Sequence, residues 1–243
     1  MSEKTEELQK IIDSYDNIVF FGGAGVSTES GIPDFRSVDG LYNQKYAYPP
    51  EQMLSHSFFL NKTEEFYRFY KDKVLALDAE PNAAHRKLAE MERAGKLKAV
   101  ITQNIDGLHQ KAGSRVVYEL HGSVHRNYCT GAGCRQFYDG RWVAMTPGVP
   151  RCERCGRIVK PDVVLYEEGL DQDILQGAVD AIRHADVLIV GGTSLVVYPA
   201  AGLLQYFRGE KIVLINKGAT SMDHKADLLI QEPIGEVLGK VRA

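Results

Sequence analysis

The sequence lacks any long apolar segment, any strong imbalance of charge and any internal repeat. No apolar run approaches the roughly 18 residues that a membrane helix needs, and residues 1–7 are charged where a signal peptide has an apolar core. The formal net charge of the 243 residues is -3, which excludes an overall basic field for nucleic acid. We therefore expect a cytoplasmic globular protein without a membrane partner, built as one large domain or as one domain that carries a smaller one.

Cysteine is absent from all of the chain except one short segment. The four cysteines lie between Cys129 and Cys155, whereas the disulfide framework of a secreted domain normally spreads through the chain. Clustering of this kind in an intracellular chain indicates a metal. Four residues separate Cys129 from Cys134, and two separate Cys152 from Cys155. Two close thiolate pairs suit tetrahedral zinc in a closed, structural site, and a reduced thiol cluster without metal is the alternative.

Apolar periodicity divides the rest of the chain into alternating strands and helices. Short apolar runs that end in turn residues predict buried strands, and apolar residues at helical spacing predict the helices between them. The predicted strands are 18–21, 98–101, 116–118, 163–166, 186–190 and 212–215. The predicted helices are 4–15, 64–77, 82–94, 171–184 and 199–207. The alternation predicts an α/β fold whose parallel sheet has helices on both faces, whereas residues 126–160 show no helical period.

A glycine turn follows the first predicted strand. Gly23 and Gly25 fit the first two positions of the dinucleotide-binding pattern, in which backbone amides at the start of a helix approach a pyrophosphate. The third glycine position holds Thr28, and the acidic residue expected about 20 residues later is missing. These glycines alone leave a nucleotide-binding turn and a purely structural tight turn both open. A dehydrogenase that transfers a hydride fits the sequence poorly.

Longer motifs carry a resemblance to one protein family. The segment 23–36, Gly-Ala-Gly-Val-Ser-Thr-Glu-Ser-Gly-Ile-Pro-Asp-Phe-Arg, resembles the cofactor-loop signature of the sirtuins almost residue for residue. Three further segments follow in the order of that family, at 102–106, 119–122 and 192–200. The paired cysteines lie between the second and the third of these, where the family has its zinc module. The chain is therefore identified as a member of the sirtuin family over residues 8–240.

The resemblance implies an activity, two cofactors and a domain organisation. It implies an NAD-dependent protein-lysine deacetylase of the bacterial type, which transfers the acetyl group of acetyl-lysine to ADP-ribose and releases nicotinamide. NAD is then the co-substrate, zinc is structural, and the partner is an acetylated protein or peptide. Residues 1–36, 76–125 and 161–243 are expected to form a Rossmann-like NAD-binding domain. Residues 37–75 are expected to form the cofactor loop and a helical insert, and residues 126–160 a small zinc-ribbon module.

The chemistry of such an enzyme explains the need for a histidine. Loss of nicotinamide leaves a reactive ribose carbon that the acetyl oxygen captures, and a base must then deprotonate a ribose hydroxyl. An unperturbed histidine has a pKa of roughly 6.5 and accepts a proton near neutral pH. By resemblance His121 is this base, and Asn104 is the second catalytic residue. The histidines expected to be surface or packing residues are His56, His125, His184 and His224.

The resemblance also implies the contacts of the co-substrate and of the peptide. Asp106 would hold the nicotinamide carboxamide, Phe35 would cover the reaction centre, and Arg36 would supply charge for the phosphates. Val164 and Val197 would flank the acyl-lysine peptide, which adds as a strand. The complete set of implied cofactor-binding residues is Ala24, Thr28, Phe35, Arg36, Gln103, Ile105, Asp106, His121, Thr193, Ser194, Asn216 and Lys217.

Alternatives to these roles and to this activity remain open. Asn104 and Asp106 are also common turn formers, and Thr193 and Ser194 could cap the N-terminus of a helix. Mono-ADP-ribosylation of a protein is the second enzymatic function, because it also begins with displacement of nicotinamide. Between residues 126 and 160, seven basic residues outnumber two acidic ones. A zinc ribbon that binds nucleic acid is therefore the alternative from another class of function.

Two segments bear on which substrates are accepted. Residues 166–168, Tyr-Glu-Glu, stand where relatives often carry Phe-Gly-Glu, so Glu167 restricts the backbone and adds a charge near the cleft. The predicted helix at 64–77 has Tyr67 and, three positions on, Tyr70, where relatives that remove acidic acyl groups have arginine. Lys71 cannot reproduce the bidentate grip of an arginine on a carboxylate. We therefore expect acetyl-lysine to be a better substrate than succinyl-lysine.

Overall fold

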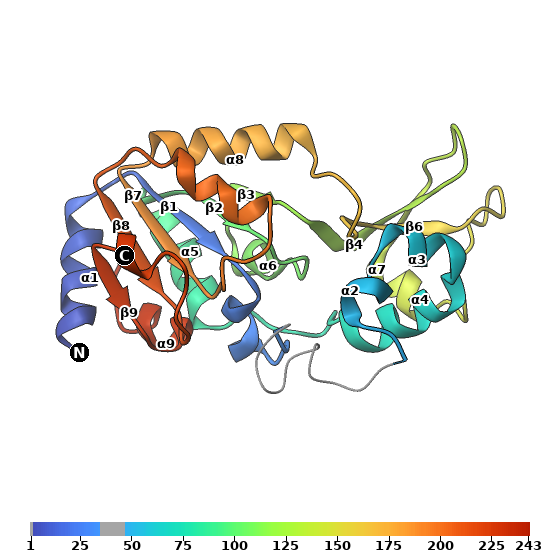
Figure 1. Cartoon of the computed structure of the whole chain (residues 1–243), viewed down its shortest axis with the longest axis horizontal. Coiled ribbons are helices and arrows are strands. Elements are labelled where there is room, and N and C mark those ends of the chain that lie inside the picture. Colours follow the sequence, from blue (N-terminus) through green and yellow to red (C-terminus); the bar gives the residue numbers. More distant parts are fainter. Residues whose placement is uncertain (1, 35–46) are drawn as a thin grey trace.

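The computed structural model describes residues 2–34 and 47–243, and the strands in this part of the chain form two separate sheets (Figure 1). The larger sheet has six strands in the order β3-β2-β1-β7-β8-β9, and every neighbouring pair is parallel. These strands are β1 (Ile18–Gly22), β2 (Leu97–Thr102), β3 (Val117–Glu119), β7 (Val187–Gly191), β8 (Lys211–Ile215) and β9 (Leu228–Ile230). The predicted parallel α/β sheet is confirmed, and β9 is an additional strand that the apolar pattern did not indicate.

Helices cover both faces of the six-stranded sheet because successive side chains of each strand point to opposite faces. Ile18 and Phe20 of β1 pack with α1, α5 and α9 on one face. Val19 and Phe21 pack with α8 and η5 on the other. Burial on both faces explains why the strands are continuous apolar runs in the sequence. The covering elements are α1 (Glu3–Ser14), α5 (Ala83–Arg93), α8 (Gln172–His184), α9 (Ile234–Leu238) and the 3-10 segment η5 (Ala200–Tyr206).

Capping side chains determine where the three long helices begin. The side chain of Ser2 accepts a hydrogen bond from the Thr5 amide at the start of α1, and the carboxylate of Asp171 accepts two amides at the start of α8. Asn82 accepts the Ala84 amide at the start of α5. Such caps satisfy donors that have no partner within the helix. All three helices lie within one residue of the predicted bounds, whereas the helix predicted at 199–207 is the 3-10 segment η5.

The smaller sheet has three antiparallel strands in the order β5-β4-β6 and carries the cysteines. Its strands are β4 (Gly122–Cys129), β5 (Phe137–Asp139) and β6 (Val159–Val163). The strand predicted at 163–166 as part of the parallel sheet is therefore wrong. Val163 and Leu165 are buried here in the core of the smaller lobe, which explains the misleading apolar pattern. The short helix α7 (Gly140–Met145), capped by Asp139, was also not expected in this segment.

Helices from the segment before α5 pack on the smaller sheet and complete the second lobe (Figure 1). They are α2 (Pro50–Met53), α3 (His56–Asn61), α4 (Thr63–Phe69) and the π-helical turn η4 (Tyr70–Val74). The helix predicted at 64–77 is therefore shorter than expected and changes from an α-helix to a π-helical turn at Tyr70. The amide of Leu75 bonds to the Tyr70 carbonyl, five residues back, which turns the following residues away from the face they would occupy in an α-helix.

The remaining elements are short. They are η1 (Ala24–Val26), η2 (Thr28–Ser30), α6 (Leu108–Ala112) and η6 (Asp223–Lys225). The division of the chain into a Rossmann-like domain, a helical insert and a zinc module stays a prediction, and β4 and β6 each run across one of its boundaries. In the described residues, no helix combines the length and the apolar character that crossing a membrane would require.

Candidate active site and metal centre

The order of the strands places a ligand-binding crevice between β1 and β7. β1 pairs with β2 on one side and with β7 on the other, and the chain builds the sheet outwards in opposite directions from these two strands. In open α/β sheets, ligands bind beyond the carboxyl ends of the strands at such a reversal. Both strands end here in glycine, β1 at Gly22 and β7 at Gly191.

Two glycine turns beyond these strands pack backbone against backbone. The Gly25 amide donates to the Gly192 carbonyl at 2.8 Å, and the Gly23 amide donates to the Gly191 carbonyl at 3.3 Å. A Cβ atom on Gly25 would lie 2.8 Å from the Gly192 Cα atom, and Gly192 itself has a φ of +59°. Glycine is needed here for close packing as well as for conformation. The glycines are thus required by the turn itself, and the same turn also lines the main cavity, so it is not reduced to a purely structural turn.

One cavity of about 1180 Å³ collects the predicted site residues that the structure describes. It extends from the glycine turns past His121 to the loop of residues 163–168. Its size is at the upper end of ordinary ligand pockets, which suits an extended dinucleotide together with a second substrate. Phe35 and Arg36 lie outside the described residues. The predicted residues that line it are Ala24, Thr28, Gln103, Asn104, Ile105, Asp106, His121, Val164, Thr193, Ser194, Val197, Asn216 and Lys217.

His121 is held in the cavity in the form that a general base requires. Its Nδ1 atom lies 2.9 Å from the Gln103 carbonyl oxygen. A carbonyl can only accept, so Nδ1 carries the hydrogen and Nε2 keeps a free lone pair. Burial lowers the pKa of His121 below its ordinary value of 6.5, and the hydrogen bond to Gln103 opposes this shift. The imidazole is therefore neutral and able to accept a proton at physiological pH.

Asn104 and Asp106 are joined by a serine that the sequence interpretation did not single out. The Ser27 hydroxyl donates to the Asp106 carboxylate at 2.6 Å and accepts from the Asn104 amide group at 3.0 Å. The second carboxylate oxygen of Asp106 accepts the Leu108 amide at 2.9 Å. Asp106 thus does act as a turn former, as the alternative held, and it also faces the cavity. The position of Ser27 inside the glycine-rich motif was the available signal for it.

A pair of buried histidines lies behind this network, and the sequence interpretation assigned no role to either of them. His85 Nδ1 accepts the Asn82 amide, which leaves the hydrogen on Nε2, 3.5 Å from the Ser27 hydroxyl. The ring of His109 is fully buried, 4.7 Å from that of His85. Burial lowers the pKa of His85 to about 4 and that of His109 well below its ordinary value. Both rings are neutral, and His85 supports Ser27 from behind without adding charge.

The other end of the cavity offers hydroxyl and amide groups at the ends of β2, β7 and β8. Gln103 donates to the Thr193 hydroxyl at 3.1 Å, and this hydroxyl also accepts the Leu195 amide at 3.2 Å. The Asn216 side chain donates to the Gly218 carbonyl at 2.7 Å. Pro199 is the N-cap of the following helix η5. The alternative that Thr193 and Ser194 cap a helix is therefore wrong, because an extended loop separates them from it.

The four cysteines converge on one point in the smaller lobe. Their sulfur atoms all lie within 4.8 Å of one another, with Cys129 and Cys155 at 3.3 Å and Cys134 and Cys152 at 3.7 Å. Zinc–sulfur bonds of about 2.3 Å in a tetrahedron place the sulfurs roughly 3.8 Å apart, so the four thiols fit one zinc ion. The same distances are too long for disulfides. Zinc is the metal that this donor set fits, and it leaves no open position for catalysis.

The basic residues of this lobe are partly neutralised. Arg126 pairs with Glu119 and with Asp162, at 2.7 and 2.8 Å. Arg141 pairs with Asp78, and Lys160 pairs with Glu168. Three of the seven basic residues thus have carboxylate partners, which weakens the case for a nucleic-acid-binding ribbon. The other four, which are exposed, are Arg135, Arg151, Arg154 and Arg157.

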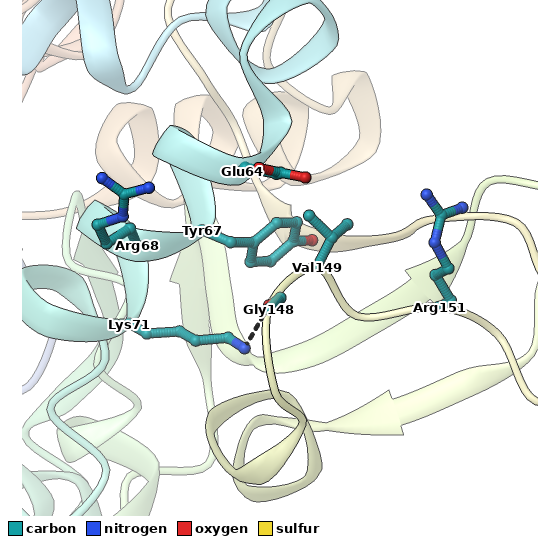
Figure 2. A pocket seen from close by; sticks show the side chains of 7 residues that line it. All are labelled: Glu64, Tyr67, Arg68, Lys71, Gly148, Val149 and Arg151. Carbon is teal, nitrogen blue, oxygen red and sulfur yellow. Dashed lines mark hydrogen bonds between the residues drawn. The ribbon is translucent and has the colours of Figure 1, made fainter.

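The side chains used above to predict acyl preference do not face the cavity of His121. Tyr67 is buried and donates to the Val159 carbonyl, and Tyr70 is fully buried in the same core. Lys71 donates to the Thr146 and Gly148 carbonyls. Figure 2 shows Tyr67 and Lys71 near Gly148, and these residues line a separate cavity of about 540 Å³. The π-turn instead brings Lys73 and Val74 to the wall of the larger cavity.

The fold and the site define a nucleotide-binding α/β enzyme that carries a structural zinc module. The family model described as the Sir2 family matches residues 23–199. The chain belongs to this family. It is 61% identical over 242 residues to the NAD-dependent protein deacetylase of Clostridium acetobutylicum, with 98% of each chain covered. It is also 61% identical over 244 residues to the NAD-dependent protein deacetylase of Clostridium perfringens, with 99% of each chain covered.

Solved structures of the family agree with the fold. A chain from a study of the mechanism and regulation of Sir2 enzymes is 42% identical, with a TM-score of 0.88 over 99% of this chain and 96% of that one. A complex of Sir2 with a p53 peptide and NAD⁺ is 40% identical, with a TM-score of 0.85 over 96% of this chain and 95% of that one. The predicted family and the α/β fold with a zinc module are confirmed.

Removal of a metal ligand is expected to destabilise the protein. In Cys152→Ala, zinc content and melting temperature should fall together, the latter by more than about 5 °C, because a closed site stabilises the fold that it ties together. Metal analysis and thermal unfolding followed by circular dichroism measure the two quantities. Arg154→Ala, two residues away and exposed, is the control and should change neither. A zinc-free variant with an unchanged melting temperature would contradict a structural role.

The protonation of His121 is expected to set the acid limb of the pH profile. The residue acts as a base only when neutral, and its pKa is lowered, so kcat/KM should fall as the pH drops through a midpoint below 6.5. The measurement is kcat/KM for an acetylated peptide between pH 5 and 8, with folding checked at each pH by circular dichroism. A midpoint above 6.5, in protein that stays folded, would show that another group controls the reaction.

Proposed function

We propose that this protein is an NAD-dependent protein-lysine deacetylase, which transfers the acetyl group of acetyl-lysine to ADP-ribose and releases nicotinamide. The observation that carries the proposal is the neutral His121, which shares one cavity with Asn104, Asp106 and the glycine turns. Relatives at 61% identity named NAD-dependent protein deacetylase support it. So does a Sir2 complex with 2'-O-acetyl-ADP-ribose and a deacetylated p53 peptide, at 39% identity and a TM-score of 0.84.

NAD supplies a ribose carbon that becomes reactive when its bond to nicotinamide breaks, and the residues of this chain position and protect it. Asp106 and the backbone of Ile105 hold the nicotinamide carboxamide. Asn104 and Gln103 order the ribose and nearby water. Asn104 is buried and anchored to Ser27, so its amide group is already oriented before the co-substrate arrives.

The adenosine half of the co-substrate lies along the ends of β1, β7 and β8. The glycine turns leave room for the phosphates close to the backbone, and Ala24 and Thr28 contact them. The remaining contacts to the phosphates and to the adenosine ribose come from Thr193, Ser194, Asn216 and Lys217. These four residues line the cavity.

His121 carries out the proton transfer. Its Nε2 atom accepts the proton of a ribose hydroxyl, while the Gln103 carbonyl keeps the hydrogen of Nδ1 in place. The ring is therefore fixed in tautomer and orientation, as an effective general base requires. The peptide substrate lies as an added strand between the segments of Val164 and Val197. The Val164 amide is already bonded to the His121 carbonyl at 3.0 Å, which leaves the Val164 carbonyl for the acyl-lysine N–H.

We also propose that the protein acts in the cytoplasm. The four thiols within 4.8 Å of one another must stay reduced to hold zinc, and reducing compartments favour metal binding over disulfides.

The zinc stabilises the smaller lobe, whose strand β6 leads directly into the segment of Val164. The metal thus supports the substrate cleft without taking part in the chemistry.

Replacement of the base is expected to abolish most of the activity. In His121→Ala, kcat should fall by about 10² to 10⁴-fold, the usual contribution of a general base, while the melting temperature changes little. The assay incubates the protein with NAD and an acetylated peptide and identifies the products by mass spectrometry. His224→Ala, an exposed histidine, is the matched control. A peptide that gains ADP-ribose instead of losing acetyl would identify an ADP-ribosyltransferase, and wild-type turnover by His121→Ala would overturn the role of the histidine.

The acyl preference is expected to favour acetyl-lysine over succinyl-lysine. Among the described residues that line the cavity the cations are Lys73 and Lys217, and an ammonium lacks the bidentate grip of arginine on a carboxylate. We expect kcat/KM for succinyl-lysine to be at least about tenfold lower on the same peptide. Equal values would contradict this. A loss of succinyl turnover in Lys73→Met would then identify the cation responsible.

A further inference from the structure

The loop of residues 165–168 forms one wall of the cavity and is tied to the helical insert. The Tyr166 amide donates to the Leu54 carbonyl, and the His56 amide donates to the Tyr166 carbonyl, both at 3.0 Å. These bonds pair the loop with residues 54–56 in the manner of a short parallel bridge. The position of the loop is therefore set by the insert on one side, and its other side faces the cavity.

Glu167 lies in this loop in a backbone conformation that side chains rarely adopt. Its φ is +77°, in the left-handed region that favours glycine. Its carboxylate accepts two hydrogen bonds from Ser57, from the amide at 2.8 Å and from the hydroxyl at 2.9 Å. These bonds to the first turn of α3 hold the side chain in one place and offset the unfavourable backbone. The glutamate is thus held as a fixed negative charge at an exposed position.

The neighbouring carboxylate is neutralised, whereas that of Glu167 is not. Glu168 contacts His56 at 2.7 Å and Lys160 at 3.1 Å and also accepts the Leu165 amide, which together lower its pKa against the opposing effect of burial. Glu167 has neutral donors from Ser57 and, within the described residues, no ion pair with a cation. The loop therefore presents one uncompensated negative charge at the cavity.

A second part of the cavity wall, at residues 197–198, is uncharged. Val197 and Tyr198 line the cavity there, and Val196 and Tyr198 are largely exposed. On the proposed function, on which this inference rests, the peptide lies between these two walls. We propose that Glu167 is a specificity-determining residue, which selects peptides with lysine or arginine close to the acetyl-lysine. Two hydrogen bonds hold the carboxylate at the wall of the cavity, so it loses little side-chain entropy when a peptide binds. A peptide cation is therefore attracted, and a peptide carboxylate is repelled.

The test compares one acetylated peptide in three forms that differ in charge at a single position. Serine, arginine or glutamate is placed at each site from three residues before to three residues after the acetyl-lysine. We expect kcat/KM for arginine over glutamate to reach about two- to fivefold at one or two of these sites, the size typical of an exposed ion pair. The preference should fade as sodium chloride is raised, because salt screens exposed charges.

Glu167→Gln removes the charge and keeps an oxygen that can accept the Ser57 amide, so the ratio of arginine to glutamate should fall to about one. Glu7→Gln is the matched control, an exposed glutamate on α1 far from the cavity, and should keep the ratio of the parent protein. Glu167→Gly relieves the backbone and removes the charge together, and its ratio should equal that of Glu167→Gln.

Several results would overturn the inference. One is the absence of the charge preference in the parent protein, and another is an unchanged ratio of arginine to glutamate in Glu167→Gln. The third is a change of this ratio only in Glu167→Gly, which would assign the effect to backbone conformation. Should Glu167→Gln fail to fold, Glu167→Gly takes its place, and a salt-dependent preference in the parent protein that remains in Glu167→Gly would overturn the inference. The serine peptide separates this inference from the proposed function, because failure to deacetylate it would contradict the function itself.

Discussion

The rest of the structure depends on one close contact, the backbone packing of the turns after β1 and β7. The amides of Gly23 and Gly25 bond to the carbonyls of Gly191 and Gly192, and a Cβ atom at Gly25 would collide with this neighbour. The contact holds the two turns together at the point where the strand order reverses, and the ends of both strands face the cavity. Gly192 also adopts the left-handed φ that this approach requires.

Around this contact the site is built from side chains whose hydrogen bonds order them in advance. Ser27 joins Asn104 to Asp106, and His85 lies behind it with a pKa lowered by burial. His121 is oriented by a backbone carbonyl rather than by a carboxylate, so no second negative charge raises its pKa. Burial and neutral hydrogen bonds therefore keep the base unprotonated at physiological pH, and the reacting groups need little reorganisation when the substrates bind.

The smaller lobe serves the site by positioning one loop. The four thiols hold the hairpin from which β6 emerges, and β6 leads to the His121–Val164 backbone bond and then to Glu167 and Glu168. Their carboxylates bind residues 56–57 of the helical insert. The smaller sheet and the helical insert thus meet at the wall of the cavity, so a metal without an open coordination position acts on the site only through the position of this loop.

The sequence by itself determined the α/β fold, the zinc ligands and the family, because these depend on local periodicity, on cysteine spacing and on contiguous motifs. Only the tertiary structure decided which distant side chains meet. Ser27 and Asp106 are 79 residues apart in the chain, and no periodic pattern encodes their contact. Tyr67 points away from the cavity, and Ser57 donates hydrogen bonds to Glu167. Both arrangements likewise follow from packing between segments that are far apart in sequence. Local patterns specify which elements form, whereas the side chains that face a site depend on how those elements pack.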